Sequence, residues 1–133
     1  MAGDPTVAIR HESDILAARR LARVLATTLD FTDIQLIELA TAISEIARNT
    51  LVYARDGEMA FTIVHDRARA GVRVIACDRG PGIHDVAAAM SDGYSTSGGL
   101  GLGLPGARRL MDAFEIASTP GVGTTITMTK WRR

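Results

Sequence analysis

The segment Ser44-Glu45-Ile46-Ala47-Arg48-Asn49 places a carboxylate and an amide four residues apart. On an α-helix this spacing brings the two side chains to one face, about 6 Å apart along the axis. A neutral amide oxygen can coordinate Mg²⁺ beside a triphosphate without the repulsion that a carboxylate adds. A carboxylate one turn earlier can orient or deprotonate a group that attacks a γ-phosphate. The alternative is a solvated Glu–Asn pair, in which Arg48 only forms an ion pair with Glu45.

A second segment, Asp78-Arg79-Gly80-Pro81-Gly82, directly follows the apolar run at 72–77. Acids at the end of a buried strand are rare unless they are paired. A carboxylate at Asp78 can accept a hydrogen bond from an exocyclic amine such as adenine N6. Gly80 and Gly82 leave room for a flat base to approach the bend. The alternative is an ordinary Asp-Gly-type turn.

A third segment, Gly98-Gly99-Leu100-Gly101-Leu102-Gly103, leaves main-chain N–H groups uncovered and leads into a predicted helix near Leu104. Such a loop before a helix start forms an anion site for phosphates. Its spacing is not that of the dinucleotide fingerprint, and a Walker-type loop is excluded because Lys130 is the only lysine. The hydroxyl of Thr124, after Gly123, can reinforce an adenine contact, although threonine is common in any strand. The three segments together supply the parts of an ATP site.

Composition limits the class of protein. The chain has 133 residues, of which 47% are hydrophobic and 23% charged, so we expect one globular domain spanning 1–133. A formal net charge of zero argues against nucleic acid as a partner. We find no secretion signal and no apolar run near the ~20 residues that a bilayer requires, so we expect no membrane contact and a cytoplasmic location. Cys77 is the only cysteine, which fits a reducing compartment, and we expect it to be buried.

Hydrophobic periodicity predicts the order β-α-α-β-β-α-α-β-β. The expected elements are a strand at 6–11, helices at 14–29 and 32–53, strands at 58–65 and 72–77, helices at 85–90 and 104–111, and strands at 114–118 and 124–130. We therefore predict an α+β fold, a two-layer α/β sandwich with a mixed β-sheet and helices on one face.

Capping signals and apolar positions refine the two long helices. Ser13 is the expected N-cap of the first, and Thr32-x-x-Gln35 resembles a capping box for the second. The expected buried positions of the second helix are Ile34, Ile37, Ile43, Ile46 and Thr50. Three arginines of the first helix, at 19, 20 and 23, form either a partner-docking patch or a solvated face.

The ordered set of motifs resembles the N box and glycine boxes of the GHKL ATPase/kinase superfamily, which includes gyrase B, Hsp90, MutL and histidine kinases. The matching motifs are Glu45-x-x-x-Asn49, Asp78-x-Gly80-x-Gly82, Gly99-x-Gly101-x-Gly103 and Gly123-Thr124. Each motif is weak alone, whereas four in order are specific. The resemblance implies the Bergerat-type ATP-binding fold of that superfamily.

A closer resemblance, nearly end to end, is to the RsbT-type serine/threonine switch kinases of bacterial stress modules, in the anti-sigma factor kinase branch. It is carried by Ala42-Ile-Ser-Glu-Ile-Ala-Arg-Asn49, the segments 78–83, 92–101 and 104–112, and the ending Thr129-Lys-Trp131. It implies phosphorylation of a Ser or Thr on a STAS-domain antagonist, and activation of a PP2C-type phosphatase in partner switching.

The resemblance also implies site roles. Asn49 would hold Mg²⁺, Asp78 would read adenine, and Glu45 would be the candidate base. A cation near the γ-phosphate must come either from this domain, where Arg48 is our candidate, or from the partner protein. The implied nucleotide-binding residues are Asn49, Asp78, Gly80, Gly82, Gly99, Leu100, Gly101, Gly103 and Thr124. Two rival interpretations are an anti-sigma factor or ATP-dependent binding module without phosphotransfer, and a fold that binds no nucleotide.

Overall fold

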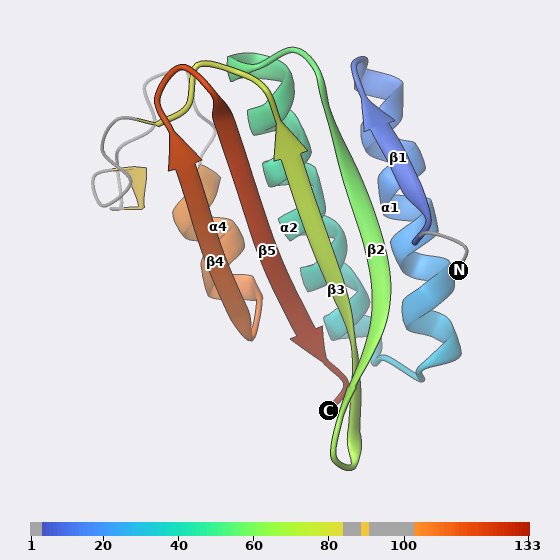
Figure 1. Cartoon of the computed structure of the whole chain (residues 1–133). Coiled ribbons are helices and arrows are strands. Elements are labelled where there is room, and N and C mark those ends of the chain that lie inside the picture. The colour runs from blue at the N-terminus through green and yellow to red at the C-terminus, as the bar shows by residue number, and fades with distance from the viewer. Residues whose placement is uncertain (1–3, 84–88, 91–102) are drawn as a thin grey trace.

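A computed structural model describes residues 4–83, 89–90 and 103–133 (Figure 1). Its elements are β1 (Thr6–Ile9), α1 (Glu12–Thr28), α2 (Asp33–Tyr53), β2 (Gly57–Asp66), β3 (Arg69–Asp78), α4 (Gly103–Leu110), β4 (Ala113–Thr119) and β5 (Gly123–Trp131). The expected helix at 85–90 falls mostly outside the described residues, as does the whole stretch 91–102. The other predicted elements are present, with ends within two or three residues of those expected.

The five strands form one sheet in the order β1-β2-β3-β5-β4, and all four described pairings are antiparallel. The mixed sheet that we predicted is therefore wrong. The reason lies in the helices between β1 and β2. Since α1 and α2 run antiparallel, the chain re-enters the sheet at the end where β1 left it, and Ile9 pairs with Gly57. The β2–β3 and β4–β5 hairpins are antiparallel because of their short turns.

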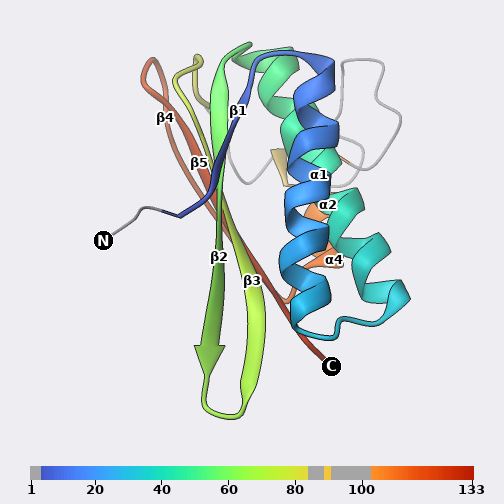
Figure 2. The same ribbon diagram turned by 90° about the vertical axis from the view of Figure 1, so that its right-hand side faces the viewer.

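All three described helices cover the same face of the sheet, as the edge-on view in Figure 2 shows. Alternate strand residues point into this layer, and Met59, Phe61, Val72 and Val74 are fully buried there. The predicted two-layer α+β sandwich is confirmed. Because successive strand side chains point to opposite faces, the residues between these buried ones lie on the open face of the sheet.

Local signals fixed the start of α2 but not that of α1. Thr32 caps α2 as predicted, since its Oγ1 accepts the N–H of Gln35 at 3.1 Å and the Gln35 side chain accepts the N–H of Thr32 at 3.2 Å. The N-cap of α1 is His11 rather than Ser13. The carboxylate of Asp14 accepts the backbone N–H groups of Arg10 and His11, each at 2.8 Å, which moves the helix start two residues earlier.

Two expectations about burial are wrong. Ile34 and Ile37 are 70% and 66% exposed, although Ile43 is fully buried. At 100° per residue, Ile34 lies half a turn away from Ile43 around the helix axis, so both cannot face the sheet. Cys77 is exposed rather than buried, because in β3 the alternation turns Ala76 inward and Cys77 toward the open face.

Candidate functional site

The C-terminal end of α2 packs against the end of β3, at the top of the sheet in Figure 1. A Cβ added to Gly57 would lie 2.7 Å from Thr50 Cγ2, and one added to Gly80 would lie 2.6 Å from Ala54 Cβ. Only a residue without a side chain fits at either point. The helix that carries Glu45 and Asn49 is therefore in contact with the turn that follows Asp78.

Asp78 is the last residue of β3 and pairs with Gly57 on one side and Thr124 on the other. Its Oδ1 accepts the N–H of Gly80 at 2.8 Å, which holds the turn closed. Its Oδ2 accepts no hydrogen bond from any described residue, and the side chain is only partly buried. One carboxylate oxygen therefore shapes the bend, and the other can accept a donor from a ligand.

Thr124 lies opposite Asp78 on the same face of the sheet and is 7% exposed. Its hydroxyl is 2.8 Å from the Ser118 hydroxyl. Ser118 Oγ donates to the Gly123 carbonyl oxygen at 3.2 Å and accepts the N–H of Ile83 at 2.7 Å. Because Ser118 has one proton to give, Thr124 donates to Ser118 and keeps its own lone pairs to accept a hydrogen bond.

Sequence reasoning missed Ser118. The signal was its place in the alternation of β4, where Phe114 and Ile116 precede it on the inward-facing side. A polar residue at the third inward position of a strand requires a partner. Here the partners come from two segments: Ile83, after the Asp78 turn, and Gly123 and Thr124, at the start of β5.

The turn after Asp78 and the β4–β5 turn touch through their backbones. The N–H of Gly121 donates to the Pro81 carbonyl oxygen at 2.7 Å. A Cβ on Gly82 would lie 2.4 Å from the Thr119 carbonyl oxygen, and one on Gly123 would lie 2.1 Å from the Asp78 carbonyl oxygen. Gly82 has a positive φ of 78°. This side of the site is therefore closely packed backbone.

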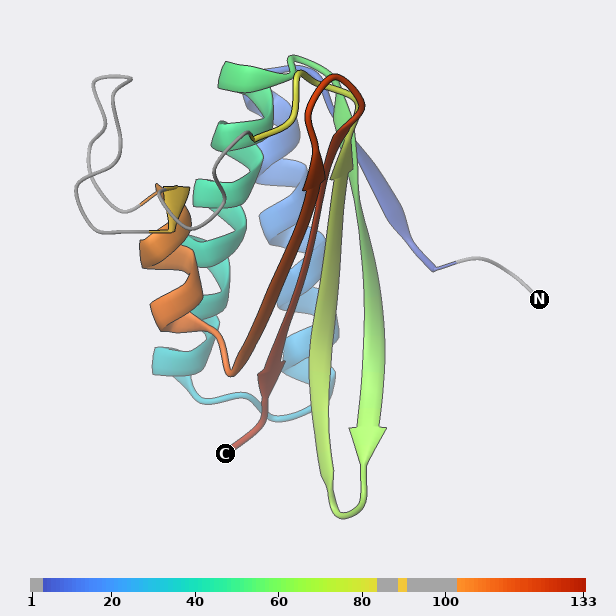
Figure 3. The same cartoon turned by 60° about the vertical axis from the view of Figure 1, so that its left-hand side comes forward.

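The start of α4 is joined to Glu45. The N–H of Gly103, the first residue of α4, donates to Glu45 Oε2 at 3.0 Å. Figure 3 shows α4 lying along α2. Glu45 Oε1 also lies 3.7 Å from Arg48, so the ion pair that we gave as the alternative for Arg48 is present. The predicted phosphate-loop residues Gly99, Leu100 and Gly101 lie outside the described part of the chain.

Asn49 is partly buried, one turn after Glu45 on α2. No group of three or more His, Cys, Asp or Glu side chains that could hold a metal occurs among residues 4–83, 89–90 and 103–133. Mg²⁺ needs no such group where phosphates supply most of the oxygens. A single amide oxygen fits that donor set, and Asn49 lies one turn after Glu45, which contacts the start of α4.

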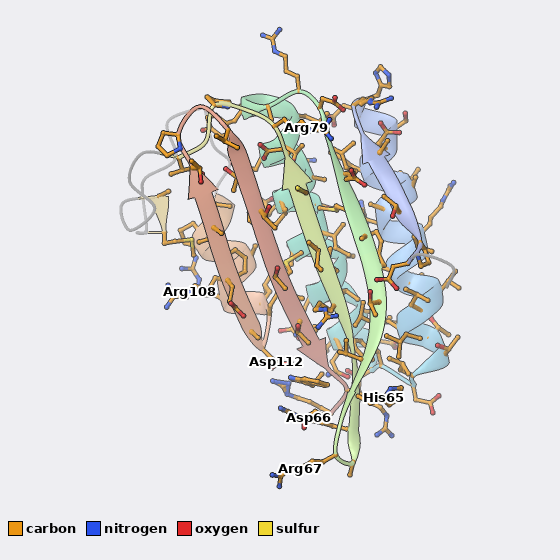
Figure 4. The ribbon with its side chains drawn as sticks, in the orientation of Figure 1. His65, Asp66, Arg67, Arg79, Arg108 and Asp112 are labelled. Carbon is orange, nitrogen blue, oxygen red and sulfur yellow. The ribbon has the colours of Figure 1, made fainter. Side chains whose placement is uncertain are left out.

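Of the charged groups labelled in Figure 4, only Arg79 lies at the site, in the turn after Asp78. Figure 4 places His65, Asp66 and Arg67 at the tip of the β2–β3 hairpin and Arg79 at the opposite end of the molecule. The three arginines at 19, 20 and 23 line a groove of about 170 Å³ between α1 and α2, with Leu16 and Leu36. No described helix is long and apolar enough to cross a membrane.

Residues 10–130 match the family model of the histidine kinase-like ATPase domain, and the chain belongs to that family. Within it, the chain belongs with the RsbT-type kinases. It is 50% identical over 127 residues to the serine/threonine-protein kinase RsbT of Bacillus subtilis (strain 168), with 96% of each chain covered.

More distant relatives carry another name. An anti-sigma F factor of Caldanaerobacter subterraneus subsp. tengcongensis is 30% identical over 118 residues, covering 86% of this chain and 82% of that protein. An anti-sigma F factor of Lysinibacillus sphaericus is 33% identical over 119 residues, with 83% and 82% covered. The solved histidine kinase domain of the E. coli osmosensor EnvZ matches with 16% identity and a TM-score of 0.47, covering 100% of this chain and 91% of that one.

Proposed function

We propose that this chain is an ATP-dependent serine/threonine protein kinase of a bacterial partner-switching, stress-response module. Its substrate is a STAS-domain antagonist, and it also binds and activates a PP2C-type phosphatase, in the cytoplasm. The observation that carries the proposal is the convergence of three motifs: Glu45 on α2 hydrogen-bonds Gly103, and the end of α2 packs on the turn after Asp78. The likeness to a serine/threonine-protein kinase over nearly the whole chain supports it.

The adenine base would lie beside Asp78. Oδ2 of that carboxylate accepts from the exocyclic amine, and the closely packed glycine turns at Gly80 and Gly82 form the wall of the pocket. Thr124 accepts a further hydrogen bond, because its own proton is given to Ser118. Thus adenine is selected by two hydrogen-bond acceptors, on Asp78 and Thr124, that the strands β3 and β5 hold in place.

The phosphates would lie at the start of α4. The positive end of the helix attracts an anion, and the glycine run 98–103 leads into it in the sequence. Asn49 is the residue that would hold Mg²⁺, which supplies charge neutralisation between the phosphates when bound. Glu45 would receive or orient the proton of the attacking hydroxyl.

Transfer of labelled phosphate tests the proposal. The purified chain is incubated with γ-labelled ATP, Mg²⁺ and the STAS-domain protein encoded nearest to it, and the STAS protein is expected to acquire label. Asn49→Ala is expected to abolish labelling. The matched control is Ser44→Ala on the same helix, whose hydroxyl donates to the Ala40 carbonyl oxygen at 2.8 Å.

The second candidate, a binding module without phosphotransfer, is favoured by the relatives named anti-sigma F factor. In that case the chain co-purifies with a sigma factor, ATP stabilises it, and no label is transferred. A third outcome, no thermal stabilisation by ATP, would exclude both functions. Ligand at 100 times Kd is expected to add about 2.7 kcal/mol to the free energy of unfolding.

A further inference from the structure

Helix α4 is attached to α2 at both of its ends. At its start, the N–H of Gly103 donates to Glu45 of α2 at 3.0 Å. At its end, the Leu110 carbonyl oxygen accepts from Lys130 Nζ at 2.6 Å, and the same Nζ lies 3.2 Å from Glu38 Oε1 of α2. The ammonium group of β5 therefore links the last residue of α4 to α2.

The spacing of the two attachments matches the length of α4. Glu38 and Glu45 are seven residues apart, which is about two turns and 10 Å along one face of α2. The eight residues of α4 span about 12 Å. The N-terminal end of α4 meets the later acid and its C-terminal end meets the earlier one, so the two helices lie antiparallel.

Charge also matches at each end. The start of a helix carries partial positive charge and its end partial negative charge. Here a carboxylate meets the start of α4, and an ammonium group meets its end. Each contact therefore stabilises the position of α4 along its own axis.

Lys130 is unusual in its own right, since the only lysine of the chain is 3% exposed. Burying an ammonium group is costly unless it is paired and hydrogen-bonded. Its two oxygen partners, from Glu38 and Leu110, come from the two helices that must be held together. An apolar residue of similar volume would fill the same space without joining them.

We propose that Lys130 and Glu38 are positioning residues that fix α4 along α2 and so set the affinity of the site for the triphosphate. The inference rests on the proposed function, which places the phosphates at the start of α4. Lys130 meets the far end of that helix, roughly 12 Å from Gly103, and so acts through α4. We call the contacts of Lys130 with Glu38 and Leu110 the clamp. The adenine contacts at Asp78 do not involve α4 and are independent of the clamp.

The test compares two ligands in one variant. In Lys130→Met the volume is kept, and we expect the fold to remain, as followed by thermal unfolding. The Kd for ATP, measured by calorimetry, is expected to rise about tenfold, while the Kd for AMP changes less than about twofold. In the labelling assay, the KM for ATP rises about as much as Kd, and kcat stays within about threefold. A general loss of structure would instead weaken both ligands.

Glu38 supplies a second variant that is expected to fold, because its side chain is 35% exposed. Glu38→Ala is expected to raise the Kd for ATP severalfold without changing that for AMP. Glu38→Gln, which keeps an oxygen acceptor for Lys130 Nζ, is expected to restore most of the affinity. The control is Arg67→Met, which removes an exposed cation at the hairpin tip.

The outcomes separate the clamp from the proposed function. If the unaltered chain binds neither AMP nor ATP, the proposed function fails. Suppose instead that the unaltered chain binds both AMP and ATP. If the folded Lys130→Met and Glu38→Ala proteins then bind ATP as tightly as the unaltered chain, only the clamp proposal is overturned. Equal weakening of ATP and AMP in both variants also overturns it, since that result means a general structural role.

Discussion

The proposed adenine side of the candidate site is packed mainly through backbone atoms, whereas its proposed phosphate side is held by a side chain. Beside Asp78, a Cβ on Gly123 would lie only 2.1 Å from a carbonyl oxygen. At the start of α4, the described attachment is one hydrogen bond from Gly103 to the Glu45 carboxylate. The backbone contact beside Asp78 leaves no space for an added side chain. The Gly103 N–H, in contrast, can exchange the Glu45 carboxylate for another acceptor.

This difference bears on how a nucleotide would be received. Packed backbone at a strand end keeps its shape whether or not a ligand is present, so the base meets a preformed surface. A backbone N–H at a helix start donates to a phosphate oxygen as readily as to a carboxylate oxygen. We therefore expect mutations on the adenine side to alter stability and base selection, and mutations on the phosphate side to alter turnover or the affinity for the triphosphate.

The largest expected effect is on turnover, at Glu45. In Glu45→Gln the side chain keeps an oxygen for the Gly103 N–H but can no longer take a proton. We expect kcat for phosphotransfer to fall about 100- to 10,000-fold, with the Kd for ATP within about threefold of its original value. Kinetic assays with calorimetry measure both. Unchanged kcat would show that Glu45 only positions the helix, and Glu58→Gln, an exposed acid on β2, is the control.

The next largest effect is on stability, at the backbone contact of Gly123. Its φ is 149°, and an added Cβ would meet the carbonyl oxygen of Asp78. We expect Gly123→Ala to lower the free energy of unfolding by about 3 kcal/mol or more, from overpacking and backbone strain together. Urea denaturation measures the change.

Gly121 in the same turn is the matched control for that substitution. Its φ is 81°, but nothing lies within 4 Å of an added Cβ. Gly121→Ala is therefore expected to cost about 1 kcal/mol, from its backbone conformation alone. Equal costs at the two positions would mean that the contact with Asp78 contributes nothing.

A smaller effect is expected for base selection at Asp78. In Asp78→Asn, Oδ1 can still hold the Gly80 N–H, but the second oxygen becomes a donor. We expect the Kd for ATP to rise about 10- to 100-fold and the preference for ATP over GTP to shrink, because the amide meets the adenine amine donor to donor. Calorimetry with both nucleotides is the measurement. Asp66→Asn at the distant hairpin tip is expected to change neither affinity.

The smallest effect lies outside the site, at the start of α1. The N–H groups of Arg10 and His11 lower the pKa of the Asp14 carboxyl below its usual value of 3.8. The unfolded chain therefore binds this proton more readily, so the stabilisation is fully present above pH 3.8 and is lost as pH falls through the folded-state pKa. We expect Asp14→Asn to reduce stability at pH 7 and to differ less from the unaltered chain at pH 3. Urea unfolding at both pH values checks this, with Glu12→Gln as control.

The sequence predicted the elements well and their arrangement less well. Hydrophobic periodicity located the described strands and both long helices, and the capping box located the start of α2, since those signals are local. The mixed sheet was wrong because strand direction depends on how α1 and α2 fold back together. The predicted burial of Ile34 and Ile37 was wrong because it was inferred from their hydrophobicity and not from their angular positions around the helix axis.

For the site, residue types were easier to predict than contacts. The motifs at 45–49, 78–82 and 123–124 meet through residues that carry no motif, such as Thr50, Ala54 and Ser118. Lys130 could be read from the sequence only as a lone lysine. Its pairing with Glu38 and Leu110 depends on three elements meeting in space.

The scarcity of lysine also gives this fold a built-in chemical probe. An amine-reactive reagent reaches the ε-amine at position 130 only when α4 and α2 separate from β5. The acylation rate of that single side chain, followed by mass spectrometry, thus reports how often this corner of the molecule opens. If added nucleotide slows the acylation of Lys130, then binding at the start of α4 makes the separation of α4 and α2 from β5, at the other end of α4, less frequent.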